Sequence, residues 1–421
     1  MQYRHLLFIA SFVSLLNGCA STPINETPPA LGKPAIPSQE ASTFGTGSTT
    51  GAPVIERIIK PDTNLPYTTT PPQNVPPSIP STAYPSAKEG QIAVAKLLPR
   101  TSDQKGWATD IFSAFAALHI PATKENFCAT IAVIEQESSF QSDPVVPGLS
   151  GIVWKEIDTR RKKYNIPELV LDAALLKSSP DGRTYKARIN ALKTEKQMNA
   201  LFDDMISELP YGKTLLSGYN PIRTGGPMQV SVEFAESQVK EKPYPYPRKD
   251  SLRNEVFSRK GGLYFGIAIL LDYPAPYSQP IYRFADFNAG RYSARNAAFQ
   301  NAIVKITGHP LALDGDLLRY NNGSPSIEPS TTQLALYSLS KKLHLSEAEI
   351  LRDIKQEKNA AFAHSPLYQR LFSLADQSAG KILPRETMPR INLKSPKIHR
   401  KLTTEWFANR VDMRYKTCLS R

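Results

Sequence analysis

The sequence has few cysteines and histidines, and it lacks the common nucleotide-binding and nucleophile motifs. Its 421 residues include three cysteines and six scattered histidines, and no Cys-x-x-Cys pair occurs. No P-loop, Rossmann glycine pattern or Gly-x-Ser-x-Gly elbow is present. These absences argue against a zinc site, a nucleotide-dependent enzyme and a serine hydrolase of the elbow type. We therefore expect a protein that works without a metal or a cofactor.

Convincing strand patterns and internal repeats are also missing. From about residue 92 onward, apolar residues recur mainly at helical spacing. We expect helices over residues 107–118, 123–139, 167–177, 186–209, 232–240, 262–272 and 331–343. A further helix is expected to begin at Ser346, with Glu349 in capping-box register. The predicted fold class is therefore mainly α.

Three short segments carry the chemical signal in this sequence. They are Glu137-Ser138-Ser139-Phe140, Gly226-Pro227-Met228-Gln229-Val230 and Phe287-Asn288-Ala289-Gly290. Taken singly, each has an ordinary structural interpretation: a solvated helix-end carboxylate, a turn, and a helix stopped by glycine. Their order along the chain and their combined chemistry favour one functional site over three separate structural interpretations.

In this order the segments resemble the Glu-Ser, Gly-Leu-Met-Gln and Ala-Tyr-Asn-Ala-Gly motifs of lytic transglycosylases of the soluble-lytic-transglycosylase type. The resemblance implies a lysozyme-like fold that acts on peptidoglycan glycan strands. It also implies that Glu137 is the catalytic acid and base, and that the adjacent Ser138 supports its position and belongs to the substrate-binding residues. The implied substrate-binding residues of the other two segments are Gly226, Met228, Gln229, Asn288, Ala289 and Gly290.

Two features depart from the pattern of that family. Residues 141–225 separate the first two segments, a much longer stretch than the family has, so we expect a helical insert at about 150–220. Phe287 stands where the family has a tyrosine whose hydroxyl bonds the catalytic glutamate. Tyr282 and Tyr292 flank this position and are the candidates to supply the hydroxyl.

The local sequence gives Glu137 a physical setting of its own. Thr123 is a suitable N-cap for the helix over 123–139, and Glu137 falls in its last turn. The negative end of the helix dipole, together with apolar neighbours such as Phe140 and Met228, would disfavour the ionised carboxylate. A general acid requires that property. The alternative is an exposed carboxylate at a helix end.

Ordinary glycosidases use two carboxylates, and no second one stands out here. The candidates are Asp143, Glu233, Glu236 and Asp286. The resemblance implies a mechanism with one carboxylate. Glu137 would protonate the oxygen between N-acetylmuramic acid and N-acetylglucosamine and then deprotonate the 6-hydroxyl, giving a 1,6-anhydro product. A hydrolytic muramidase and a non-catalytic peptidoglycan-binding lipoprotein are the alternatives.

The N-terminus indicates a location in the cell envelope. An apolar run over residues 6–16 follows Arg4; it is too short to span a bilayer and has the length of a signal-peptide core. The run ends before Cys19 in a sequence that resembles a bacterial lipobox, which implies removal of residues 1–18 and lipidation of Cys19. A signal peptide with a chance cysteine is the alternative. No aspartate follows Cys19, so we expect an outer-membrane lipoprotein facing the periplasm. The chain also resembles an uncharacterised family of bacterial lipoproteins.

Composition divides the rest of the chain. Residues 19–91 are rich in proline, serine and threonine, which predicts a disordered tether. At ~3 Å per residue, such a tether would reach up to roughly 200 Å. We expect the lysozyme-like domain over residues 92–325 and a helical, basic C-terminal region packed on it over 326–421.

The net charge of +13 is concentrated partly near the C-terminus. Residues 385–421 hold ten Lys or Arg and three Asp or Glu. A secreted lipoprotein rarely meets nucleic acid, so carboxylates of the wall or anionic lipids are the expected partners, with a merely solvated face as the alternative. Trp406, Phe407 and Val411 predict that part of this region docks as a helix.

Two cysteines remain once Cys19 carries lipid. In an oxidising periplasm, Cys128 and Cys418 can form a disulfide that joins the C-terminus to the helix of Glu137. Cys128 can equally serve as a small buried apolar residue. Both interpretations stay open from the sequence.

Overall fold

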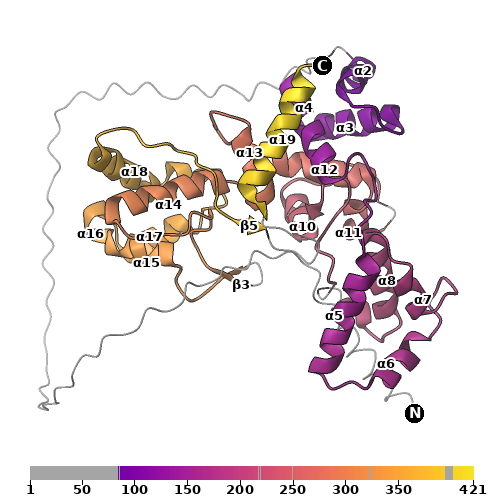
Figure 1. The fold of residues 1–421 in the computed structure, drawn as a ribbon. Helices are drawn as coiled ribbons and strands as arrows, with labels where there is room; N and C mark the ends of the chain where they lie inside the picture. Colours follow the sequence, from indigo (N-terminus) through magenta and orange to yellow (C-terminus); the bar gives the residue numbers. More distant parts are fainter. Residues whose placement is uncertain are drawn as a thin grey trace, which may run out of the picture. The chain divides into compact units, whose positions relative to one another are not determined.

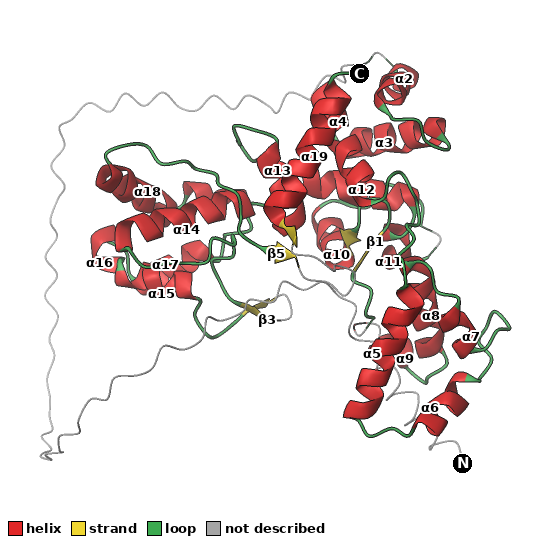
Figure 2. Ribbon diagram, viewed as in Figure 1, coloured by secondary structure: helices red, strands yellow, loops and turns green. Residues whose placement is uncertain are grey.

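The computed structural model describes residues 84, 86–216, 218, 220–248, 250–321, 324–393 and 402–421. The predicted signal peptide, Cys19 and nearly all of the tether lie outside the described residues. The described chain is mainly helical, as predicted (Figures 1 and 2). Its strands form two-residue antiparallel pairs: β1 (Thr224–Gly225) with β2 (Val230–Ser231), β3 (Tyr320–Asn321) with β4 (Ser324–Pro325), and β5 (Asn392–Leu393) with β6 (Leu402–Thr403).

The first hydrophobic core is built around helix α12 (Arg259–Leu271), which is buried on most of its circumference. A helix that is apolar all round requires neighbours on every side. The other helices that contribute buried residues to this core are α2 (Ala87–Leu97), α3 (Gln104–Leu118), α4 (Lys124–Glu137), α10 (Val232–Glu241), α11 (Leu252–Val256), α13 (Ile281–Ala289) and α19 (Thr404–Leu419).

The insert forms a second core. Its helices are α5 (Leu149–Lys163), α6 (Glu168–Leu175), α7 (Tyr185–Asn190), α8 (Glu195–Ser207) and α9 (Gly212–Leu216). The prediction of one helix over 186–209 is wrong, because α7 and α8 are separate. Thr194 and Gln197 form a capping box that starts α8 anew, so the chain between the two helices cannot continue as a helix.

A third core packs on α14 (Ser293–Thr307). It holds α15 (Thr331–Ser338), α16 (Ser340–Leu343), α17 (Glu347–Ile354), the short 3-10 helix η2 (Ala360–His364) and α18 (Pro366–Ala379). The capping box of Ser346 and Glu349 is present as predicted. This core starts in α14, before the expected boundary at residue 325, whereas α19 belongs to the first core. The C-terminal region is therefore divided between two cores.

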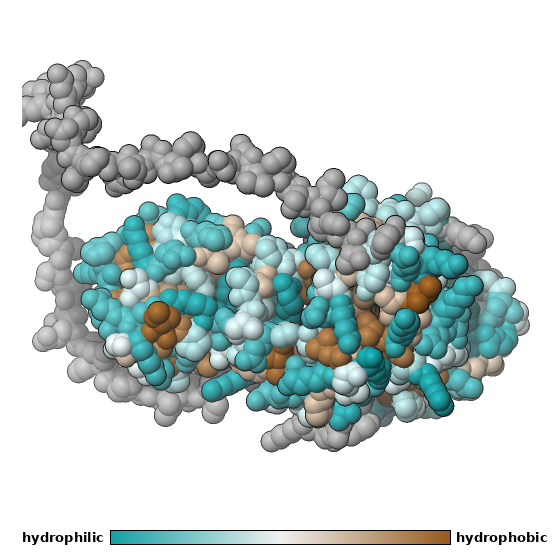
Figure 3. Space-filling model, turned by 90° about the horizontal axis from the view of Figure 1, so that it is seen from above, coloured by the Kyte–Doolittle hydropathy of each residue, from teal (hydrophilic) through white to brown (hydrophobic). Residues whose placement is uncertain are grey.

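Figure 3 shows hydrophilic groups over most of one face, with hydrophobic groups in separate patches. Leu169 and Tyr211 of the insert are among the exposed large hydrophobic residues. Of the helices in the described ranges, none is both long and apolar enough to cross a bilayer.

Candidate functional site

The first segment lies where α4 ends. The helix begins after Thr123, whose side chain accepts a hydrogen bond from the Asn126 N–H at 3.2 Å, as predicted. Its last residue is Glu137, which is half-buried. The helix stops two residues earlier than expected because Ser139 (φ 49°) and Phe140 (φ 61°) both adopt the left-handed conformation.

Two contacts hold the turn after Glu137 in place. The Ser138 hydroxyl donates to the Ile134 carbonyl at 3.1 Å, so this buried serine closes the helix end. Phe140 is buried and meets the Trp107 ring edge to face, with 5.3 Å between centroids. Consecutive left-handed residues other than glycine are costly and persist only where the surroundings hold them. Glu137 therefore extends from a rigid helix end.

The second segment is the turn between β1 and β2. Gly226 has φ +73°, and a Cβ atom there would lie 2.2 Å from the Val256 carbonyl oxygen. Gln229 also has a positive φ of 49°, and its Nε2 donates to the Gly226 carbonyl at 3.2 Å. Gln229 is half-buried and remains a candidate to contact a ligand.

Met228 corrects the expectation that it lines a sugar subsite. Its side chain has 0% exposure and packs against α12 at Gly266, where an added Cβ would lie 2.3 Å from the Met228 sulfur. A side chain without accessible surface cannot touch a ligand in this conformation. We therefore assign Met228 to the core beneath the turn.

The third segment closes α13. Gly290 has φ +111° and follows Ala289, the last residue of the helix, so glycine stops the helix as the sequence suggested. The Asn288 Oδ1 accepts a hydrogen bond from the Thr404 hydroxyl of α19 at 2.9 Å. Phe287 stacks on Phe407 of the same helix at 6.4 Å. The C-terminal helix thus contacts this segment directly.

One core unites the three segments. Phe140 and Met228 are buried in the first core, and Phe287 packs against it. Some left-handed residues other than glycine belong to these segments: Ser139, Phe140 and Gln229 lie within them, and Tyr292 follows the third. Segments far apart in the sequence therefore contribute to one hydrophobic core.

Asp286 stabilises the start of α14 through hydrogen bonds. It is fully buried, and its carboxylate accepts hydrogen bonds from the hydroxyls of Tyr273 (3.0 Å) and Tyr277 (2.6 Å). It also accepts from the N–H groups of Tyr292 (2.8 Å) and Ala294 (2.7 Å), and so caps α14, whose own N-cap residue makes no side-chain cap bond. Burial raises the pKa of Asp286 to about 6. Its lack of exposed surface excludes it as a second carboxylate in contact with substrate.

The other acidic candidates lie elsewhere. Glu233 and Glu236 are exposed on α10. Asp143 follows the first segment and accepts a hydrogen bond from the Thr194 hydroxyl of the insert at 3.0 Å. The two tyrosines proposed as hydroxyl donors contact the tyrosines that bind Asp286: the Tyr292 ring lies edge to face with Tyr273, with 5.1 Å between centroids, and the Tyr282 ring lies 6.0 Å from that of Tyr277.

Helix α19 is fixed to α4. Cys128 and Cys418 form a disulfide with 5.4 Å between their Cα atoms, and both residues are buried. Arg414 of α19 lies 3.7 Å from the Glu135 carboxylate of α4, and Figure 1 shows the two helices side by side. Phe407 and Val411 are buried, so this part of the basic region docks as a helix, as predicted.

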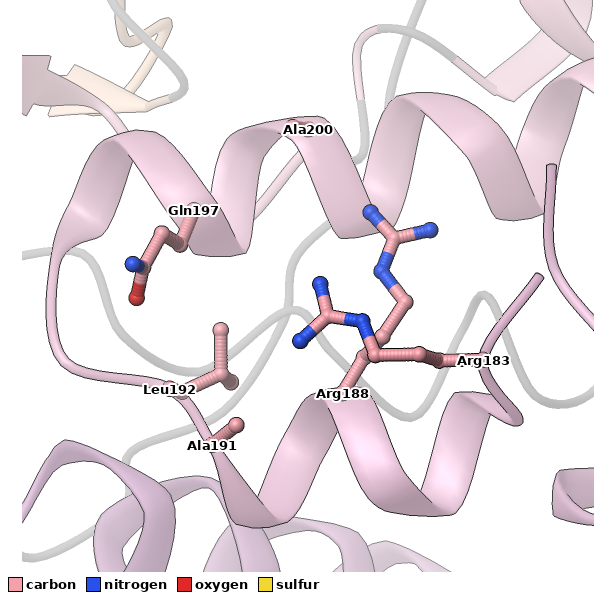
Figure 4. A pocket seen from close by; sticks show the side chains of 6 residues that line it. All are labelled: Arg183, Arg188, Ala191, Leu192, Gln197 and Ala200. Atoms are coloured by element: carbon pink, nitrogen blue, oxygen red, sulfur yellow. The ribbon is translucent and has the colours of Figure 1, made fainter. Parts of the chain in front are cut away.

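Described residues line one cavity beside the first segment and another in the insert. One of about 340 Å³ is lined by Asp143, just past the first segment, and by charged residues of α3, α8 and α12. Another of about 190 Å³ lies in the insert, where Arg183 and Arg188 approach it opposite Gln197 and Ala200 of α8 (Figure 4). Asp181 and Asp204 already pair with these two arginines at 2.6 Å each. In the described part of the chain, no three His, Cys, Asp or Glu side chains are placed to hold a metal ion.

Comparisons with known proteins give relatives without an assigned function. A family model described as "Protein of unknown function (DUF1615)" matches residues 100–421. The "Uncharacterized protein YaiW" of Escherichia coli (strain K12) is 49% identical over 326 residues, which cover 77% of this chain and 88% of that protein. No solved structure matches the chain.

Proposed function

The chain belongs to the DUF1615 family, and we propose that it is a peptidoglycan lytic transglycosylase with Glu137 as its single acid and base. One observation carries this proposal. Each of the three segments that resemble the transglycosylase motifs has a residue in or against the first core, and Glu137 is half-buried at a fixed helix end. Attachment of all three segments to one core supports a shared site, because catalytic groups act at near-contact distances.

The proposed chemistry needs one carboxyl group and no water. The protonated Glu137 gives its proton to the glycosidic oxygen as the bond from that oxygen to C1 of N-acetylmuramic acid breaks. The 2-acetamido group of the substrate stabilises the positive charge that develops at C1. The 6-hydroxyl oxygen then bonds to C1 while its proton passes to the Glu137 carboxylate. The product is a 1,6-anhydro sugar, and Glu137 regains its starting protonation state.

Digestion of purified sacculi by the full-length protein tests this proposal. Glu137→Gln should lower the release of anhydro-muropeptides by a factor of about 100 or more, because it removes the general acid and base. Glu135→Gln is the matched control: it changes a carboxylate of the same helix that lies beside Arg414, and release should stay near the wild-type rate. Mass analysis of the muropeptides is the measurement. Products with reducing ends would identify a hydrolytic muramidase instead.

A second candidate function is a non-catalytic peptidoglycan-binding lipoprotein. Two contacts favour it. The Asn288 amide oxygen accepts a hydrogen bond from the Thr404 hydroxyl, and Phe287 packs on Phe407 of α19. Under this alternative the wild-type protein releases no muropeptides, and both it and Glu137→Gln sediment with sacculi. That result would overturn the enzymatic proposal.

We also propose an outer-membrane location facing the periplasm, with Cys19 as the lipidated residue. The lipobox-like sequence before Cys19 and the proline-rich stretch behind it support this location. A lipid anchor and a long tether would bring the helical domain to the wall while keeping it attached to the membrane.

A further inference from the structure

The larger cavity joins the insert to the core that holds the three segments. Its volume is about 340 Å³, and its charged lining consists of Asp110, Asp143, Lys196, Arg259 and Lys260. Asp110 comes from α3, Lys196 from the first turn of α8, and the last two from the N-terminus of α12. Phe257, buried in the core of the insert, supplies an apolar wall. Four separate parts of the chain thus build one mixed-charge site.

The charges of this cavity are only partly neutralised. The Arg259 guanidinium forms ion pairs with the carboxylates of Asp110 and Asp103, with N–O distances of 2.6 Å each. It also lies over the Trp107 ring. Lys196 and Lys260 make no ion pair with any described carboxylate, and Lys260 sits 4.1 Å above the Tyr246 ring. The N-terminus of α12 adds positive potential at Lys260.

Asp143 is the counterpart of the two lysines. Its carboxylate accepts a hydrogen bond from the Thr194 hydroxyl at 3.0 Å but has no cationic partner within the described ranges. Beside the Arg259 cluster, in which one guanidinium pairs with two carboxylates, the cavity presents two lysines without an ion pair and one carboxylate without a cationic partner in the described part of the chain. A ligand that complements this arrangement carries carboxylates and an ammonium group on a short backbone.

The cavity is also close to the candidate catalytic residue. Phe140 and Arg259 both contact the Trp107 ring, with centroid distances of 5.3 Å. Ser142, another lining residue, follows Glu137 by five positions. Since an extended chain spans at most ~3.6 Å per residue, their Cα atoms lie within about 18 Å of each other. A glycan held at Glu137 and a peptide attached to it can therefore occupy both places.

We propose that this cavity binds the stem peptide of peptidoglycan. Lys196 and Lys260 bind its carboxylates, and Asp143 binds the side-chain ammonium of its diamino acid. The inference rests on the proposed function, because that function defines the polymer to which the peptide belongs. It adds a specificity-determining site, formed partly by the insert, to the site of cleavage.

Binding of the free stem tetrapeptide to the full-length protein tests the cavity without any cleavage. Calorimetry should show that the double variant Lys196→Ala/Lys260→Ala raises the Kd at least tenfold. The matched control is Lys193→Ala/Lys240→Ala, which removes two exposed lysines outside the cavity and should leave the Kd unchanged. No binding by the wild type, or equal weakening by both double variants, would refute the proposal.

A modified peptide tests the role of Asp143. Acetylation of the diamino-acid ammonium should weaken binding to the wild type, and Asp143→Asn should weaken binding of the unmodified peptide to a similar extent. The two changes combined should cost little more than either one alone, because they remove the same ion pair. Fully additive effects would show that the ammonium binds elsewhere.

Comparison of substrates separates this inference from the proposed function. The wild type should release anhydro products faster from intact sacculi than from glycan stripped of peptides by an amidase. The lysine double variant should lose this preference and keep its rate on stripped glycan. If products appear without any preference, cleavage stands and the peptide site fails. If the tetrapeptide binds through the two lysines but no product appears, the peptide site stands and the enzymatic function fails.

Discussion

At the scale of single residues, the three segments contain several left-handed backbone positions. Gly226 occupies a left-handed position against the Val256 carbonyl, and Ser139, Phe140 and Gln229 fill other left-handed positions in these segments. Such conformations cost free energy and need support from packing. Here Phe140 on Trp107 and the hydrogen bond of Gln229 provide part of that support.

Substitution of Gly226 tests this geometry. Gly226→Ala should lower the free energy of unfolding by about 3 kcal/mol or more, since left-handed strain adds to a clash with backbone. Gly308→Ala is the control: Gly308 has a similar φ of +70° and open space around it, so about 1 kcal/mol is expected. Urea unfolding measures both. Equal losses would show that the contact with Val256 does not matter.

Asp286 leads to a prediction about pH. Burial raises its pKa from 3.8 to about 6, so the folded state keeps a proton that the unfolded chain has already lost. The contribution of Asp286 to stability therefore falls between about pH 4 and pH 6, by up to about 3 kcal/mol. Asp286→Asn removes this titration, so its cost in unfolding free energy should shrink as the pH rises through this window. Urea unfolding at several pH values provides the measurement, and a cost that grows with pH would contradict the assignment.

At the scale of elements, the C-terminal helix holds together two helices that carry parts of the candidate site. Helix α19 contacts α4 through the Cys128–Cys418 disulfide and α13 through Thr404 and Phe407. These are the two helices that end in Glu137 and in the Asn288 segment. The helix thus fixes the positions of two of the three segments relative to each other.

Removal of the disulfide tests how much this bond stabilises the packing of α19 on α4. Cys128→Ala/Cys418→Ala should lower the free energy of unfolding by about 2–5 kcal/mol, because the bond closes a loop across a separation of 290 residues. A reductant should destabilise the wild type to a similar degree and leave the double variant unchanged. Urea titrations with and without reductant supply the comparison. A wild type that is indifferent to reductant would mean that α19 docks without the help of this bond.

At the scale of the whole molecule, the proposal depends on attachment of the helical domain to a membrane. The residues concerned, 1–83, lie outside those that the structure describes. Cys19→Ser should move the protein from the membrane fraction to the soluble fraction and abolish labelling with a fatty-acid analogue. Ser21→Ala, two residues further along, should leave both properties unchanged. Membrane retention of the Cys19 variant would rule out lipidation as the anchor.

The sequence by itself determined most of what is local. The helical class, the N-cap Thr123, the capping box of Ser346 and Glu349, and the glycine stop after Ala289 all follow from neighbours within a few positions. The break at Thr194 was missed although its capping box is also local, because the apolar spacing continues across it. Boundaries of elements depend on such single hydrogen bonds.

Only the tertiary structure decided which side chains face a ligand and which face the core. Met228 and Asp286 resemble site residues in the sequence, yet long-range packing buries both. The pairing of Cys128 with Cys418, the Asn288–Thr404 bond and the cavity around Asp143 join residues that are far apart in the chain. Local patterns record the period of an element and its ends, whereas burial and contact depend on what the rest of the chain places against it.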